Sequence, residues 1–68
     1  MNTAANIAEQ FGHRSRFLAV LVAAELNAKG EWEVDFVNDL RQRFEQHDTR
    51  MLLSNLQRKQ LCRIAGEF

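Results

Sequence analysis

The sequence has no proline, no tyrosine, only three glycines and a single cysteine among its 68 residues. One cysteine excludes a disulfide framework within the chain, and no Cys/His cluster has the spacing of a zinc site. Three scattered glycines exclude a glycine-rich phosphate loop. The longest apolar run, residues 17–24, is far shorter than the roughly 20 residues that cross a bilayer. No targeting signal is visible at the N-terminus. We therefore expect one small domain over residues 1–68, in the cytoplasm and without a membrane partner.

The residues that are present favour helices. Long stretches of Ala, Leu, Glu, Gln and Arg without strand-like alternation predict an all-α fold, a compact bundle of three main helices plus a short N-terminal helix. The short helix is expected over residues 3–11, with Thr3 as its N-cap and Gly12 in the left-handed position after its end. The second helix is expected over residues 15–29. Because its middle is apolar all round, it should be the central helix.

Two further helices are expected in the second half of the chain. The third has an apolar stripe with a four-residue repeat that begins at Trp32 and ends at Phe44. A polar turn at residues 46–50 follows, and Ser54 and Gln57 then have the spacing of a capping box that starts a fourth helix reaching Phe68. The predicted core comprises Phe17, Leu18, Leu21, Trp32, Phe36, Leu40, Phe44, Leu56, Leu61 and Ile64.

Charge is balanced in sum but not along the chain. Nine basic residues match nine acidic ones, yet residues 25–39 hold five acids and one base, whereas residues 40–66 hold six bases and two acids. Glu31, Asp35 and Asp39 recur every four residues and share one face of the third helix. A hard cation normally needs a loop or a substrate phosphate as well, so we interpret this acidic strip as a solvated face or a binding surface for a protein partner.

Residue types that can act in catalysis are present, but the sequence pattern does not place them together as a catalytic group. His13 and His47 are expected in polar turns, and Cys62 borders the apolar arc of the fourth helix. None of these is placed by the sequence beside a group that would tune it as a nucleophile, base or metal ligand. We therefore expect no catalytic, cofactor or metal site and a protein that is not an enzyme.

A hydrophobic and glycine pattern runs through residues 3–21. It consists of Ile7, Ala8, Phe11, Gly12, Leu18 and Leu21. This pattern resembles the helix-turn-helix of DNA-binding transcriptional regulators. The resemblance implies that Arg14, Ser15 and Arg16 begin a recognition helix that enters the major groove. On the same interpretation a second group contacts phosphates: Arg58, Lys59 and Arg63. The alternative is that Gly12 only ends one packed helix before the next.

A second pattern covers residues 29–65. It consists of Trp32, Phe36, Leu40, Leu53, Ser54, Gln57, Leu61 and Ile64. It resembles a helical hairpin of small phage, prophage and plasmid proteins of mostly unknown function. The resemblance implies a small non-catalytic binding protein that acts by stoichiometric protein–protein interaction, for example by inhibiting a host or defence complex. DNA binding through the helix-turn-helix is the alternative function, and the apolar excess is equally consistent with a homodimer.

Overall fold

The computed structural model describes residues 4–66 and confirms the all-α fold, with three long helices and a short one. A 3-10 turn follows the third helix, and two very short strands pair with each other. The elements are β1 (Ala5–Asn6), α1 (Ile7–Phe11), α2 (Arg14–Asn27), α3 (Gly30–His47), the 3-10 turn (Asp48–Arg50), β2 (Leu52–Leu53) and α4 (Asn55–Ala65).

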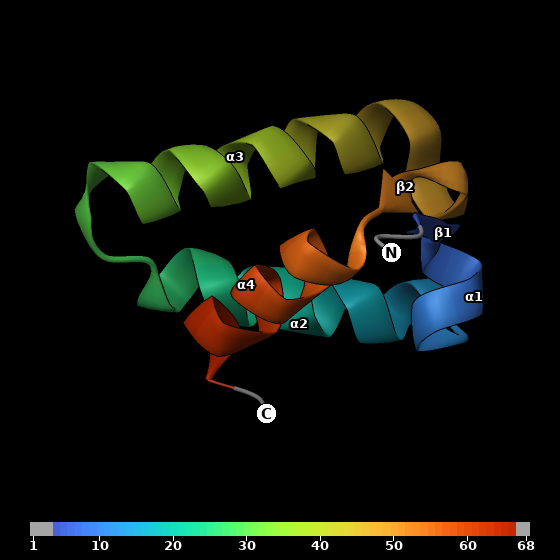
Figure 1. The fold of residues 1–68 in the computed structure, drawn as a ribbon, viewed down its shortest axis with the longest axis horizontal. Helices are drawn as coiled ribbons and strands as arrows, with labels where there is room; N and C mark the ends of the chain where they lie inside the picture. Colours follow the sequence, from blue (N-terminus) through green and yellow to red (C-terminus); the bar gives the residue numbers. More distant parts are fainter. Residues whose placement is uncertain (1–3, 67–68) are drawn as a thin grey trace.

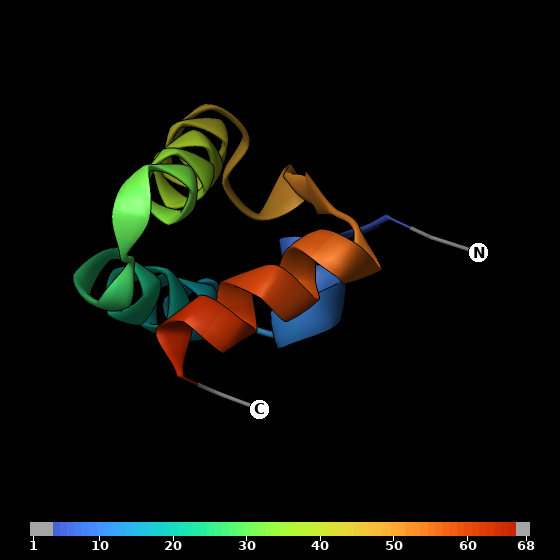
Figure 2. The same cartoon turned by 60° about the vertical axis from the view of Figure 1, so that its left-hand side comes forward.

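Helix α2 is the centre of the molecule, as its apolar middle predicts. The helices α1, α3 and α4 all pack against it. Figures 1 and 2 show α3 running over one side of the pair that α2 and α4 form. The strands β1 and β2 were not expected. They pair antiparallel with Ala5 opposite Leu53, and so tie the start of the described chain to the segment that precedes α4.

The core confirms most of the predicted residues and corrects two of them. The buried members of the predicted set are Phe17, Leu21, Leu40, Phe44, Leu61 and Ile64, while Leu18 and Phe36 are partly buried. Trp32 is 60% exposed and Leu56 is 57% exposed, so their expected burial is wrong. Helix α3 packs on α2 through the face that carries Val37, Leu40 and Phe44. Trp32 lies roughly a third of a turn away from the middle of that face.

Some core residues come from short elements that the periodicity of the long helices does not reveal. Ile7 is the first residue of α1, Met51 directly precedes β2, and Leu53 lies in β2. All three side chains are essentially inaccessible to solvent. The backbone N–H of Ile7 donates to the carbonyl of Met51 at 3.2 Å. The two-stranded pairing therefore delivers these side chains to the core.

The helix ends differ from the expected ones at several places, and α2 covers Arg14–Asn27 instead of residues 15–29. Helix α1 is capped by Asn6, whose side chain accepts from the Glu9 N–H at 2.8 Å, whereas the predicted cap Thr3 lies outside the described residues. Helix α3 continues two residues into the predicted polar turn, to His47, and the rest of that segment forms the 3-10 turn. Helix α4 ends at Ala65 with Gly66 in the left-handed conformation, and the expected end, Phe68, lies outside the described residues. Gly12 follows α1 with a positive φ of 81°, as predicted, but its ψ of −49° lies outside the left-handed helical region that was expected.

The capping box of α4 is confirmed and provides a test of local stability. Ser54 Oγ accepts from the Gln57 N–H at 3.1 Å, and Gln57 Oε1 accepts from the Ser54 N–H at 3.1 Å. We expect Ser54→Ala to lower the free energy of unfolding by about 1 kcal/mol, because a helix N–H loses its partner. In thermal unfolding followed by circular dichroism this corresponds to a midpoint about 4–8 °C lower. Ser15→Ala is the control, since Ser15 is exposed on α2, and an equal loss there would contradict the role of the cap.

Candidate functional site

A groove lies where the end of α1 and the first half of α2 meet α4. Its volume is about 600 Å³, and its lining combines cationic, polar and apolar side chains. The lining residues are Gln10, Phe11, Arg16, Val20, Arg58, Lys59, Cys62 and Arg63. We call this feature the basic groove.

Helical periodicity explains why these side chains converge. On α4, Arg58 and Cys62 are four residues apart, and so are Lys59 and Arg63, which places all four along one side of the helix. On α2, Arg16 and Val20 are also one turn apart. Because α4 packs along α2, the two sides meet and form opposite walls.

The basic groove unites four of the six predicted nucleic-acid contacts. Arg16 comes from the helix-turn-helix segment, and the other three are the cations of α4, so residues about 40 positions apart in sequence meet in one site. Arg14 and Ser15 are not part of it. Arg14 Nε donates instead to Asp48 Oδ1 at 2.9 Å, and its guanidinium lies 5.3 Å from the centre of the Phe44 ring.

Three of the four cations in the groove have no acidic partner in residues 4–66. The ion pairs of this part of the chain involve Arg14, Arg41, Arg43 and Arg63, and none involves Arg16, Arg58 or Lys59. Within residues 4–66 the groove therefore gathers three cations without an ion-pair partner, although the chain has no net charge. A concavity lined by charge of one sign raises the local concentration of oppositely charged ligands.

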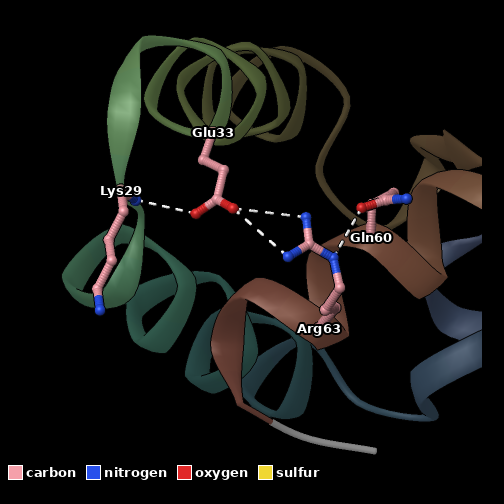
Figure 3. Close-up of polar contacts among 4 residues, drawn as sticks. All are labelled: Lys29, Glu33, Gln60 and Arg63. Carbon is pink, nitrogen blue, oxygen red and sulfur yellow. Dashed lines mark hydrogen bonds and ion pairs between the residues drawn. The ribbon is translucent and has the colours of Figure 1, made fainter.

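Arg63 is held at the edge of the groove by a polar network around Glu33 (Figure 3). Glu33 Oε2 accepts from the two terminal nitrogens of Arg63 at 3.4 and 3.5 Å, and Glu33 Oε1 accepts from the backbone N–H of Lys29 at 2.9 Å. Arg63 Nε donates to Gln60 Oε1 at 3.0 Å. The network links the start of α3 to α4 and limits the positions that the Arg63 side chain adopts.

Gln10 is a groove residue that the sequence reasoning missed. Its Nε2 donates to the carbonyls of Ala5 and Leu53, both at 2.8 Å, and thereby joins α1 to both short strands. Its Oε1 is buried and has no hydrogen-bond partner within residues 4–66. The amide orientation is set by the two carbonyl acceptors, because reversing it would bring oxygen against oxygen. No signal in the sequence indicates this role, since it depends on a strand pairing.

The predicted acidic strip lies on the exposed side of α3. Glu31, Asp35 and Asp39 are all exposed, and Asp39 forms an ion pair with Arg43 one turn further along the helix, at 3.9 Å. In residues 4–66 no three histidine, cysteine or carboxylate side chains gather as metal ligands would, and that includes this strip. Next to it Trp32 stacks on Phe36, with ring centres 5.3 Å apart and planes 6° from parallel. An exposed aromatic pair beside carboxylates is a surface of a kind that protein partners use.

The candidate catalytic residues belong to three different parts of the described chain. His13 precedes α2 as its N-cap residue, and His47 is the last residue of α3 rather than part of a turn. Cys62 is partly buried in the groove wall.

The best-formed ion pair lies away from the groove and gives a prediction for pH. Arg41 Nε donates to Glu25 Oε2 at 2.8 Å and a terminal nitrogen donates to Oε1 at 2.6 Å, joining α3 to α2. The hydrogen bond from the Arg41 guanidinium holds the pKa of Glu25 below its usual value, although desolvation opposes this. Because the folded-state pKa is lowered, the pair stabilises the fold above the unfolded pKa of about 4.3 and loses this contribution as the pH falls through the folded pKa.

We therefore expect Glu25→Gln to lower the free energy of unfolding by less than about 1 kcal/mol at neutral pH, since both side chains are partly exposed. At a pH well below the folded pKa of Glu25, the variant and the unchanged protein should be equally stable in urea. A difference of the same size at both pH values would show that the substitution acts through packing instead.

Comparisons with family models, with curated proteins and with solved structures give no significant match. Within residues 4–66 no helix combines the length and the apolar character that a membrane crossing requires. The functional argument therefore rests on the geometry and charge of the basic groove and of the α3 surface.

Proposed function

We propose that this chain is a small non-catalytic binding protein that binds the phosphate groups of nucleic acid in its basic groove. The observation that carries the proposal is the convergence of Arg16, Arg58, Lys59 and Arg63 on one concavity, with three of them lacking an acidic partner within residues 4–66. Arginine and lysine neutralise phosphate groups of nucleic acid and donate hydrogen bonds to their oxygens. Neutral net charge does not prevent this, because the acids of α3 are gathered in a different part of the chain.

Salt dependence tests the proposal directly. Each phosphate that a cation neutralises releases condensed counterions, so four contacts predict a slope of roughly −3 in a plot of log affinity against log salt. We would titrate the protein into a fluorescently labelled mixed-sequence oligonucleotide and follow anisotropy at several salt concentrations. Measurable binding at low salt that weakens with this slope supports the proposal. The absence of binding at every salt concentration contradicts it.

A second candidate function is stoichiometric binding to a protein, of the inhibitory kind that the hairpin resemblance implies for phage and mobile-element proteins. The observation that favours it is the exposed Trp32, stacked on Phe36 beside the acidic strip. This surface suits a basic protein partner. Once a partner is in hand, charge reversal at Asp35 and Asp39 should abolish that binding and leave nucleic-acid binding intact.

Association with a second copy of the chain, as a homodimer, is a further form of the proposed protein binding. The outer side of α2 exposes Val22 and Leu26, the latter by 81%, and an apolar surface of this kind can associate with a second copy. Sedimentation at rising protein concentration tests it, with Leu26→Glu as the variant that should stay monomeric.

A further inference from the structure

Resting on the proposed function, we infer that the basic groove binds single-stranded nucleic acid rather than a duplex. In this arrangement one unstacked base lies against the apolar wall of the groove, next to Phe11. The flanking phosphates lie on Arg16, Arg58 and Lys59, the groove cations that have no ion-pair partner among the described residues.

The shape of the site favours a single strand. Base edges of a duplex lie inside its grooves, and a protein reads them with a protruding helix or ribbon. Here the cations line a hollow of about 600 Å³. This volume is in the range of roughly 300–1,000 Å³ that is typical of pockets for compact ligands. A hollow of this size can accept one base that is out of its stack, whereas a base pair inside a helix has no access to it.

The composition of the wall also favours a base. Phe11, Val20 and Cys62 share the groove with the cations. Phe11 packs edge-on with Phe17, at 5.2 Å between ring centres, and remains partly exposed in the groove. Proteins that bind single strands combine a cationic track for the backbone with aromatic and apolar surfaces for the bases, which is the combination found here.

The alternative surface for a duplex has little chemistry to read it. By the helix-turn-helix resemblance, α2 would enter the major groove. Beyond Ser15 in its first turn, however, its outer side exposes Ala19, Val22 and Leu26, which have no side-chain donor or acceptor for a base edge. Arg14, at the start of α2, is engaged by Asp48.

The test compares three labelled probes of about twelve nucleotides in anisotropy titrations at low salt. One is an unstructured single strand, the second is the same strand as a duplex, and the third has the same backbone with abasic sites in place of the bases. We expect the single strand to bind about tenfold more tightly than either of the others, because only it offers both a free base and the phosphates. Phe11→Leu should reduce the preference over the abasic strand to less than about threefold and leave the salt slope unchanged, since it removes the aromatic ring and no charge.

The outcomes separate this inference from the proposed function. If the duplex or the abasic strand binds as tightly as the single strand, with the expected salt slope, the inference is overturned and phosphate binding stands. If none of the probes binds, both are overturned. The comparison of probes uses the unchanged protein, so it remains decisive even if Phe11→Leu is too unstable to measure.

Discussion

Replacing Phe17 by alanine is expected to lower the free energy of unfolding by about 3–5 kcal/mol. The side chain is fully buried in α2 and its ring lies 5.2 Å from that of Phe11 and 4.9 Å from that of Phe44. The substitution therefore removes apolar contacts with α1 and α3 together and leaves a cavity. A domain of this length is stabilised by only about 3–10 kcal/mol in total. Urea unfolding followed by circular dichroism should show a midpoint at much lower urea, and no folded baseline at all if the total stability lies at the lower end of this range.

Trp32→Ala is the matched control for this prediction, because it removes an even larger aromatic side chain. Trp32 is mostly exposed, and the ring contact that it makes within residues 4–66 is with Phe36 on the same helix. We expect a loss of less than about 1 kcal/mol, as for other surface side chains with a single aromatic neighbour. Equal losses at the two positions would mean that α3 buries the face predicted from its stripe rather than the face seen in the structure.

Reversing two charges in the basic groove is expected to have the largest effect on binding. In Arg58→Glu/Lys59→Glu both cations become acids, so two phosphate contacts are lost and two repulsive charges are added. For a single strand the salt slope should become shallower by roughly 1.4, and the affinity at low salt should fall by about tenfold or more. Both side chains lie in α4 outside the core, so the fold should persist, which circular dichroism checks.

Lys29→Glu/Arg50→Glu is the matched control, because it changes the net charge by the same amount. Neither residue lines the groove, and both are exposed. The affinity of this control variant for the single strand should fall only through the general effect of added negative charge. The fall should be clearly smaller than the fall in the groove variant. If the two double variants lose affinity equally, binding follows net charge and the groove has no special role.

Local features of this fold were predictable because they depend on residues close together in the chain. The capping box of Ser54 and Gln57 involves a spacing of three residues, and the positive φ of Gly12 reflects the freedom of a residue without Cβ. The two residues that were wrongly predicted to be in the core also share one cause. Trp32 and Leu56 follow helical periodicity, but periodicity shows that a helix has an apolar side and does not show how wide a strip its neighbours cover.

The candidate site also has one part that the sequence predicted and another that only the packing of the helices reveals. The type and spacing of Arg58, Lys59 and Arg63 already placed three cations along one helix, and they were predicted as phosphate contacts. Their meeting with Arg16 and Phe11 required α4 to pack along α2, and the position of Gln10 required the pairing of Ala5 with Leu53. Such contacts depend on which helix faces pack against each other. Several faces have comparable apolar character, so the packing is set by the whole chain and not by any one helix.

By itself, then, the sequence determined that the protein is helical, roughly where its four helices lie, and that its cations gather in the second half of the chain, because these features arise from propensity, capping and composition. The tertiary structure alone decided which apolar faces are buried. It also decided which cations keep an acidic partner and that Arg16 joins those of α4 in one groove, because packing selects among helix faces that are equivalent in local sequence.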